Sequence, residues 1–568
     1  MMMLHGKGVA PGAAVGHVFI YNKNYDIPAE SFILSGQEQA HLNRYFSVKK
    51  QALEELEKIK VSMLKVDSAK AAIFDAQKEI VEDIIINEEI PARILNERWS
   101  GAWAVYQVYE TVLNVLRNTP DPLISERAAD FDDVRALLLK IWYGQKTEGL
   151  SNLPEPVIVA ARELLPSDTA GLKRDKVLAI ITEAGGITSH TAIIAKSFGI
   201  PAVLGIEGLL NSIKQGQLVA VNAEEGTVIV DPKDDVKKEF LEKSGVFNRE
   251  RQETEGFLEK EGRTACGTKI EISLNISSSN DEELKMQSFT DSVGLLRTEF
   301  LYMEHNKLPP EDEQFYSYKK ILECFNEKPV VLRTLDIGGD KQVPYLDFKR
   351  EDNPFLGNRG IRFCFSNRDI LKTQIRAALR ASVYGNLWIL LPMITSLDDI
   401  RNAKKIIKEA GNELKKEGIK FNDVKTGIMI EVPGIAHIAD LAAQEVDFAS
   451  IGSNDLCQYL CAADRMNETV ESYYQCYHPA VFRLIKTAIS AFNDAGKSIS
   501  ICGELGNDVK AVPVLIGLGL RKFSMGAASI AAVKKTISGL TIEKAQETAL
   551  HVLGLPTAEE IEKYLELI

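Results

Sequence analysis

The feature that most constrains the fold is a regular alternation of short apolar runs and amphipathic stretches after Thr268. Each run is rich in β-branched residues, and each is followed by a stretch with helical spacing. Eight such units over about 300 residues predict a (β/α)₈ barrel of the TIM type. The predicted strands are Lys269–Ile276, Ser292–Leu296, Val330–Leu335, Leu387–Pro392, Gly427–Glu431, Phe448–Ile451, Ser498–Ile501 and Lys522–Met525.

Several residues with side chains suited to chemistry stand at the carboxyl ends of these predicted strands, where a barrel of this kind places its active site. Glu431 and Asp455 end neighbouring strands. Two carboxylates within reach of one hard cation favour Mg²⁺, with phosphate oxygens and waters as its other ligands. The other positions singled out at these ends are Asn275, Arg297, Arg333, Asp336, Met393, Asn454, Cys502 and Glu504.

Three arginines are expected on the same face: Arg297, Arg333 and Arg465. One arginine alone would be read as a surface ion pair, but three around a metal predict a ligand with several negative charges, such as a phosphorylated carboxylate. Asn454 can donate to a phosphate or enolate oxygen. Cys502 can donate a proton to carbon, although a small buried thiol that only packs is the alternative.

A histidine lies in the glycine-rich stretch that follows the apolar run Val177–Thr182. Gly185 and Gly186 end the predicted strand, and a helix is expected to begin near Thr191, which places His190 at a helix start. Backbone N–H groups there favour an anion, and a neutral imidazole is a competent nucleophile near neutral pH. The alternative is a turn histidine that only caps or packs. We predict that His190 accepts a phosphoryl group.

The rest of the chain divides by its pattern, and the whole is predicted to be a multidomain α/β protein. Residues 1–29 and 145–232 alternate strand and helix and predict a small β/α domain that carries His190. Residues 30–144 predict an inserted bundle of about four helices, with 19 acidic against 14 basic residues. Residues 233–263 are rich in charge and predict a helical linker. The barrel then occupies 264–568.

The composition narrows the class of protein. A net charge of −13 argues against binding of nucleic acid and suits a basic protein partner. The seven cysteines are scattered with no CxxC pair, which is typical of reduced thiols in a cytoplasm rather than of zinc or a disulfide framework. No apolar run reaches the length of a membrane span, so we expect a cytoplasmic protein with no membrane contact.

Six short motifs, each weak alone, are highly specific in this order, and through them the chain resembles Enzyme I of the bacterial phosphoenolpyruvate:sugar phosphotransferase system essentially end to end. The motifs are Gly185-Gly-Ile-Thr-Ser-His-Thr-Ala-Ile193, Gly294-Leu-Leu-Arg-Thr-Glu-Phe-Leu301, Arg333-Thr-Leu-Asp-Ile-Gly-Gly-Asp-Lys341, Asn353-Pro-Phe-Leu-Gly357, Gly452-Ser-Asn-Asp455 and Cys502-Gly-Glu-Leu505.

The resemblance implies a reaction. Phosphoenolpyruvate would phosphorylate His190, which would pass the group to a histidine of the phosphocarrier HPr and so start sugar transport, while Cys502 protonates the enolate released as pyruvate. It implies Mg²⁺ on Glu431 and Asp455 and a homodimer formed through the barrel. The residues implied in binding phosphoenolpyruvate are Arg297, Arg333, Asn454, Asp455 and Arg465.

The resemblance also makes the helical insert the docking domain for HPr, through Ala72-Ile-Phe-Asp-Ala76 and Glu126-Arg-Ala-Ala-Asp130. Some positions depart from the family pattern. Ile187 and Lys196 stand where many members carry arginine. The segment Gln77-Lys-Glu79 stands where a histidine and apolar residues are common, which bears on the identity of the carrier. Gly506-Asn507 replaces the usual Ala-Gly.

Two other functions share part of this pattern. A pyruvate-phosphate dikinase or phosphoenolpyruvate synthase shares a mobile phosphohistidine domain and a similar barrel, but it needs an ATP-binding domain, and no P-loop pattern occurs here. A regulatory docking protein with a decayed site is disfavoured because every proposed catalytic position is filled. ATP-dependent phosphorylation of pyruvate would support the first function. Carrier binding without phosphate exchange would support the second.

Overall fold

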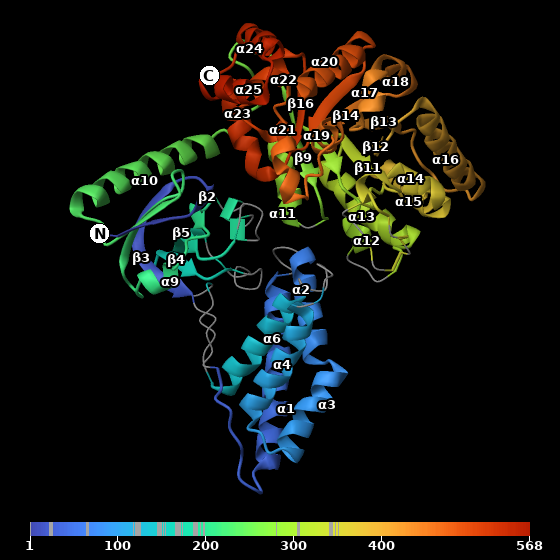
Figure 1. Ribbon diagram of the computed structural model, residues 1–568. Coiled ribbons are helices and arrows are strands. Elements are labelled where there is room, and N and C mark those ends of the chain that lie inside the picture. The colour runs from blue at the N-terminus through green and yellow to red at the C-terminus, as the bar shows by residue number, and fades with distance from the viewer. Residues whose placement is uncertain are drawn as a thin grey trace. The chain divides into compact units, whose positions relative to one another are not determined.

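The computed structural model describes two compact units, residues 1–251 and 252–568. Figure 1 shows the whole ribbon. At residues 59, 61–63, 68–73, 75, 129, 248, 250, 251, 281, 282 and 468 only the backbone is described. The structure describes all residues other than 1, 22–26, 64–67, 118, 120–126, 145–149, 151, 152, 154, 165–171, 173, 186–190, 193, 194, 197, 198, 280, 304–306, 340–342, 344, 347 and 350.

The first unit contains an eight-stranded mixed sheet in the order β1-β8-β7-β3-β4-β5-β6-β2. Strands β3 to β6 run parallel, and β1, β2, β7 and β8 are joined through antiparallel pairs. The apolar run Val177–Thr182, predicted to be a strand, is confirmed as β5. The strands are β1 Met2–His5, β2 Lys7–Ala10, β3 Ala13–Tyr21, β4 Val157–Ala161, β5 Val177–Thr182, β6 Ala202–Leu204, β7 Leu218–Asn222 and β8 Thr227–Val230.

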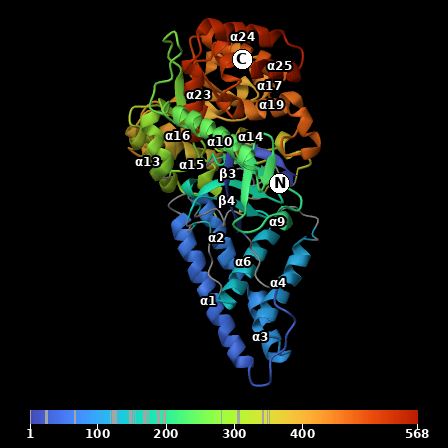
Figure 2. The ribbon, with the colours of Figure 1, turned by 90° about the vertical axis from the view of Figure 1, so that its left-hand side faces the viewer.

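A bundle of helices is inserted between the paired neighbours β3 and β4. In Figures 1 and 2 its long helices lie side by side, and α1 packs against α2, α3 and α6. Apolar residues from all five helices meet in one core, among them Tyr45, Phe74, Ile90, Tyr109 and Leu139. Five helices are described where about four were expected. They are α1 Glu38–Met63, α2 Ser68–Val81, α3 Ile84–Asn96, α4 Gly101–Arg117 and α6 Ala128–Trp142.

Helix α10, Asp234–Glu255, lies in the charge-rich segment expected to be helical, and the division between the two units falls within it. Its Phe240 is buried against Ala220 and Ile229 of the sheet. Val236 packs against the same cluster, so two apolar side chains on a mostly charged helix fasten α10 to the first unit. A short helix, α9 Leu209–Ser212, and a 3₁₀ turn, Arg174–Lys176, complete the elements described in this unit.

The second unit is a closed barrel of eight parallel strands in the order β9 to β16, with β16 paired to β9. All eight predicted strands are confirmed, each to within two residues at both ends. The observed bounds are β9 Glu271–Ile276, β10 Ser292–Leu296, β11 Val330–Arg333, β12 Leu387–Leu391, β13 Lys425–Ile430, β14 Phe448–Gly452, β15 Ser498–Cys502 and β16 Lys522–Met525.

Helices follow the strands and cover the outside of the barrel. The 3₁₀ turns of the unit are Lys285–Phe289, Pro354–Leu356, Ser382–Tyr384, Glu468–Tyr473 and Ala527–Ser529. Its helices are α11 Asp281–Leu284, α12 Phe300–Met303, α13 Glu311–Phe325, α14 Ile361–Ser366, α15 Arg368–Ala381, α16 Leu397–Lys416, α17 Pro433–His437, α18 Ala439–Glu445, α19 Ser453–Cys461, α20 Pro479–Asp494, α21 Glu504–Asn507, α22 Val512–Gly517, α23 Ile530–Ser538, α24 Ile542–Gly554 and α25 Ala558–Glu566.

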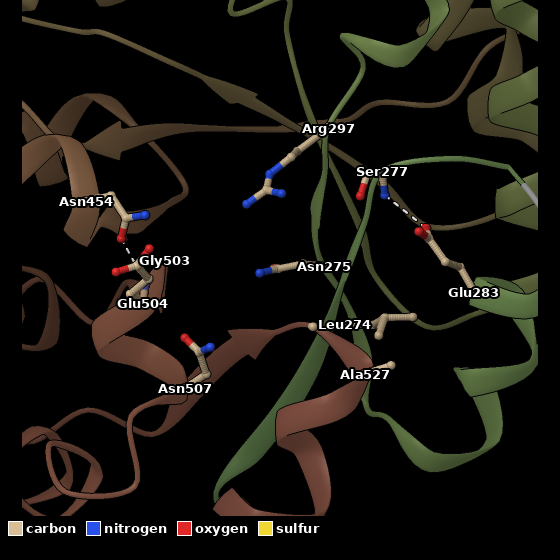
Figure 3. Close-up of a pocket in the computed structure, with 11 residues that line it drawn as sticks. Leu274, Asn275, Ser277, Glu283, Arg297, Asn454, Gly503, Glu504, Asn507 and Ala527 are labelled. Carbon is tan, nitrogen blue, oxygen red and sulfur yellow. Dashed lines mark hydrogen bonds between the residues drawn. The ribbon is translucent and has the colours of Figure 1, made fainter. Parts of the chain in front are cut away.

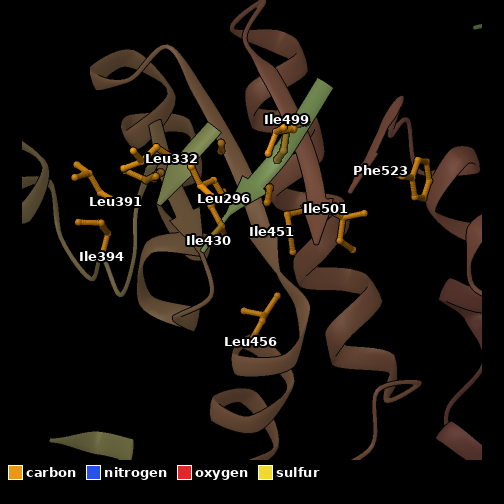
Figure 4. Close-up of a cluster of buried hydrophobic side chains, with 14 of the residues drawn as sticks. Leu296, Leu332, Leu391, Ile394, Ile430, Ile451, Leu456, Ile499, Ile501 and Phe523 are labelled. Atoms are coloured by element: carbon orange, nitrogen blue, oxygen red, sulfur yellow. The ribbon is translucent and has the colours of Figure 1, made fainter. Parts of the chain in front are cut away.

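Both faces of the barrel strands are buried, which explains why they read as continuous apolar runs. Leu391, Ile430 and Ile501 belong to a large cluster that includes the surrounding helices, part of which is shown in Figure 4. Neighbouring strand residues such as Leu390 and Met429 form a smaller cluster drawn from six strands and no helix. That smaller cluster is the barrel interior. Within the described chain, no helix is long and apolar enough to span a bilayer.

Candidate active site at the carboxyl ends of the barrel strands

A pocket of about 340 Å³ opens where β9, β10, β14, β15 and β16 end. Figure 3 shows the Arg297 side chain and the amides of Asn275, Asn454 and Asn507 around it. Arg297 follows β10 directly and is exposed, so its guanidinium is available to a ligand. The pocket is lined by Leu274, Asn275, Ser277, Glu283, Arg297, Asn454, Gly503, Glu504, Asn507, Gly526 and Ala527.

The backbone at Gly503 shapes one wall of this pocket. Gly503 has a φ of +88°, and a Cβ there would lie 2.4 Å from Ser453 Oγ and 2.7 Å from Asn454 Oδ1. Only glycine combines that conformation with that closeness. The following N–H, of Glu504, donates to Asn454 Oδ1 at 2.8 Å. Because Oδ1 is thus used as an acceptor, the Asn454 amide NH₂ is left to donate to a ligand oxygen.

Beside the pocket, charged side chains form one continuous chain of ion pairs. Arg333 pairs with Glu299 and with Asp336, whose Oδ2 lies 3.0 Å from Nη1. Arg359 bridges Asp336 at 3.3 Å and Asp455 at 2.9 Å. The chain ends at Arg465, whose Nη1 lies 3.6 Å from Asp455 Oδ1. Arg333, Asp455 and Arg465 are thereby brought together as predicted, but as paired groups rather than as free cations.

Buried polar atoms without a hydrogen-bond partner gather around these pairs. In the described part of the chain they include Arg333 Nε, Arg359 Nε, Glu431 Oε2 and Gln458 Nε2. Leaving such an atom unsatisfied costs about 1–3 kcal/mol, and native proteins rarely do so without a functional reason. Four of them on neighbouring barrel elements indicate that the site is built to receive polar ligands.

Glu431 follows β13 and is almost fully buried. Its Oε1 accepts from the Met393 N–H at 2.6 Å, and Met393 has a φ of +56°, which is uncommon for a residue with a side chain. Burial, together with the charges of Asp455 and Asp336, raises the pKa of Glu431 to about 8. The strained backbone at Met393 therefore directs its N–H toward the Glu431 carboxylate. The protein by itself disfavours the ionised form of that carboxylate.

The surroundings of Glu431 and Asp455 suit a divalent cation. Burial disfavours the ionised form of Glu431, its Oε2 has no hydrogen-bond partner among the residues that the structure describes, and Asp455 follows the adjacent strand. A cation would stabilise that ionised form. Among the described residues no group of three or more His, Cys, Asp or Glu could hold a metal. A cation here would therefore need ligand oxygens from substrate and water, as Mg²⁺ commonly does.

Cys502 ends β15 and lies inside the barrel. Its thiol donates to the Ile451 carbonyl at 3.4 Å, and Ser450 Oγ donates to its sulfur at 3.6 Å. Burial raises the pKa of Cys502. The thiol therefore keeps its proton at neutral pH, which is the form that a proton donor needs.

His190 and the neighbouring Ile187 lie outside the described residues. Just after them, Thr191 and Ala192 begin a helical stretch, as predicted. Thr191 is buried, and its hydroxyl donates to the Leu164 carbonyl at 3.1 Å. The residue that follows His190 is therefore anchored in the β/α domain.

Sequence reasoning did not single out Arg359, Glu299 or Tyr459. Arg359 is one of the largest fully buried side chains of the molecule, and it links Asp336 to Asp455. Tyr459 donates to the Phe355 carbonyl at 2.6 Å and receives a hydrogen bond from Arg359 at 3.2 Å. Glu299 was overlooked because it stands two residues past Arg297 within a quoted motif. Arg359 stands on a loop after β11, where no strand end draws attention to it.

Three family models match successive parts of the chain. They describe the N-terminal part, the mobile domain and the phosphoenolpyruvate-binding domain of phosphoenolpyruvate-utilising enzymes, and they match residues 5–127, 153–226 and 251–542. A phosphoenolpyruvate-protein phosphotransferase of Bacillus sp. (strain S) is 40% identical over 99% of this chain and 97% of its own length. The chain belongs to this family of phosphoenolpyruvate-protein phosphotransferases.

A second phosphoenolpyruvate-protein phosphotransferase is similar along its full length. The protein of Bacillus subtilis (strain 168) is 39% identical over 100% of this chain and 99% of its own length. The solution structure of an Enzyme I protein, nEIt, is 34% identical and covers 43% of this chain and 99% of its own, with a TM-score of 0.38. The resemblance predicted from the motifs is confirmed.

Proposed function

We propose that the chain transfers the phosphoryl group of phosphoenolpyruvate to its own His190 and then to a histidine of the phosphocarrier HPr, releasing pyruvate and starting the sugar phosphotransferase system. Its family membership shows that the chain is a phosphoenolpyruvate-dependent phosphotransferase. The observation that most supports the location of the reaction is the group of unpartnered buried polar atoms on Arg333, Arg359 and Glu431.

The proposed binding site uses two kinds of contact. Arg297 and Asn454 line the pocket and would donate to the phosphate and enol oxygens. Arg333 and Arg465, held by carboxylates, would add positive charge beside the pocket. Because the arginines are already oriented by ion pairs, little reorganisation is needed when charge spreads over the transferring phosphoryl group.

The proposed chemistry balances without a further reactant. A ring nitrogen of His190 attacks phosphorus in line, the bond from phosphorus to the enol oxygen breaks, and the enolate of pyruvate leaves. Cys502 then gives its proton to the methylene carbon of the enolate. Phosphoenolpyruvate-utilising enzymes generally use a divalent metal. Here Glu431 and Asp455 would hold Mg²⁺, which would supply positive charge at the phosphate and enolate oxygens.

The parts of the chain are assigned to separate tasks. Residues 1–29 and 145–232 would carry the phosphohistidine, and 233–263 would link this domain to the barrel of 264–568. The inserted bundle of 30–144 would dock HPr, whose proposed basic surface suits the acidic excess of the insert. A homodimer through the barrel rests on the family resemblance. The seven free cysteines suit a cytoplasmic setting.

Phosphoenolpyruvate labelled in its phosphate group tests the proposal. With Mg²⁺ present, the full chain should take up acid-labile, base-stable label, and HPr should then remove it. The His190→Ala variant should take up none. His17→Ala is the matched control, since His17 lies in the same β/α domain but is exposed and contacts the Gly216 carbonyl. Label retained in the His190→Ala protein would refute the assignment of the phosphorylated residue.

A further inference from the structure

A buried serine lies beneath the thiol of Cys502 inside the barrel. Ser450 is the third residue of β14 and is fully buried, and its hydroxyl donates to the Cys502 sulfur at 3.6 Å. Two residues before it, Phe448 belongs to the cluster of side chains in the barrel interior, as Cys502 does. Because alternate residues of a strand face the same side of a sheet, Ser450 also faces the interior.

The register of β14 against β15 places Ser450 away from the substrate pocket. Cys502 is the last residue of β15 and pairs with Gly452, so Ser450 stands two residues nearer the amino end of its own strand. Two residues of a strand span about 6–7 Å. Ser450 is fully buried at that depth and cannot contact a ligand. Any effect of Ser450 on the reaction is therefore exerted through the sulfur of Cys502.

The hydrogen bond from Ser450 is weak while the thiol is neutral. A neutral sulfur is a poor acceptor, and Cys502 belongs to a cluster whose other members are apolar. A hydroxyl with such a partner in such a place costs free energy that an alanine would avoid. In the part of the chain that the structure describes, Ser450 is the one side chain that donates to this sulfur. Its hydroxyl is useful in a state in which the sulfur is a better acceptor.

The proposed reaction creates that state. When Cys502 gives its proton to the methylene carbon of the enolate, the S–H bond breaks, a C–H bond forms, and the electron pair stays on sulfur. The thiol first donates to the Ile451 carbonyl at 3.4 Å, and a thiolate loses that hydrogen bond. The hydrogen bond from Ser450 remains, and a charged acceptor strengthens it. The Ser450 hydroxyl therefore stabilises the thiolate more than it stabilises the thiol.

We propose that Ser450 is a positioning residue for the proton transfer, which holds the Cys502 sulfur in place and stabilises the thiolate formed together with pyruvate. Burial raises the pKa of Cys502, and the hydrogen bond from Ser450 opposes that rise. The thiolate takes up a proton from water after pyruvate leaves. This inference rests on the proposed function, because it requires Cys502 to be the proton donor.

Single-turnover reactions of the full-length protein with labelled phosphoenolpyruvate and Mg²⁺ test the role of Ser450. Ser450→Ala should take up label on His190 at nearly the wild-type rate but form pyruvate about 10–100-fold more slowly, as expected from the loss of a hydrogen bond to a charged group. The slowing of pyruvate formation in D₂O should be larger in this variant than in the wild type, because proton transfer then limits the rate. Pyruvate formation at the wild-type rate would overturn the proposal.

Ser500→Ala is the matched control for the loss of a hydroxyl. Ser500 pairs with Ser450 on the next strand, but its hydroxyl donates to the Ala449 carbonyl at 3.4 Å rather than to a sulfur. This variant should form pyruvate at the wild-type rate, with the wild-type response to D₂O. An equal loss in both serine variants would contradict a specific role of Ser450 and assign its effect to packing.

A double variant shows whether Ser450 acts through Cys502. The protein with both Ser450→Ala and Cys502→Ala should form pyruvate no more slowly than Cys502→Ala alone, because the serine then has no thiolate to stabilise. Losses that multiply would overturn the proposal. Failure of the proposed function looks different: either His190 takes up no label in the wild type, or Cys502→Ala forms pyruvate at the wild-type rate.

Discussion

Single residues of the site depend on ion-pair partners that cannot be identified from the sequence. Arg333 is almost fully buried and pairs with Glu299 and Asp336. It is not a free cation at the pocket, and only its Nε is left without a partner in the described structure. An arginine held in this way keeps its orientation before substrate arrives, which favours stabilisation of the transition state over simple attraction of the anion.

Removing the thiol of Cys502 tests its role as the proton donor. We expect Cys502→Ala to lower the rate of pyruvate formation about 10²–10⁴-fold, the usual contribution of a positioned acid. Binding of phosphoenolpyruvate should change little, because the thiol carries no charge in the ground state. Single-turnover phosphorylation and pyruvate release separate the two effects.

Cys364→Ala is the matched control for Cys502, since Cys364 is also buried and donates to a backbone carbonyl, that of Leu335 at 3.6 Å. It should release pyruvate at the wild-type rate. Pyruvate release at that rate from the Cys502→Ala protein would instead assign the thiol to core packing. Arg465→Ala offers a contrast, because it should damage binding as well.

Arg359 should be essential to the stability of the barrel. Arg359→Met leaves Asp336 and Asp455 without their shared buried cation, a change that typically costs about 3–5 kcal/mol. Arg401→Met removes an exposed arginine paired with Glu445, and it should leave the melting temperature close to that of the wild type because water screens the pair. Calorimetric unfolding of the full-length variants compares the two. Equal shifts of the melting temperature would contradict the buried network described here.

The sequence predicts the burial of the barrel strands better than it predicts the side-chain contacts of the inserted helices. Each barrel strand is buried on both faces, so its apolar run identifies it regardless of register. In the bundle, Gln77 is buried and its amide donates to Asp133 at 3.4 Å, while Lys78 pairs with Glu57. Gln77 thus belongs to the core of the bundle rather than to an exposed docking surface.

The acidic bundle should dock HPr partly through long-range charge. We expect the affinity for HPr to fall as salt rises, because the Debye length shrinks from about 10 Å at 0.1 M to about 3 Å at 1 M. Titration calorimetry with HPr at several salt concentrations measures this. An affinity that does not change with salt would indicate that apolar contacts supply the binding energy. The exposed Ile84 and Ile85 at the start of α3 are candidates for such contacts.

At the scale of the whole molecule, the chain is two compact units whose division falls within α10. The first unit contains the stretch around His190 and the bundle, and the second contains the pocket and the ion-pair chain. Each unit has its own buried core. This division predicts that the two halves of the proposed reaction can be separated.

A fragment of residues 1–255, which ends with α10, should fold and exchange phosphate with phosphorylated HPr. It should take up no label from phosphoenolpyruvate, because Arg297, Asn454 and Cys502 lie outside it. Circular dichroism checks the folding, and label transfer in both directions checks the exchange, with the full-length chain as the control. Direct labelling of the fragment by phosphoenolpyruvate would contradict the proposed division of tasks.

The sequence by itself determined the barrel, the order of its strands and the family, because periodicity and contiguous motifs are local properties that need no knowledge of distant partners. It also pointed to the strand ends, where Arg297, Glu431 and Cys502 stand. Only the tertiary structure decided how those residues are engaged. Arg359 reaches Asp336 and Asp455 across 23 and 96 positions of chain. Pairings of that kind depend on how the barrel closes, and no local pattern encodes them.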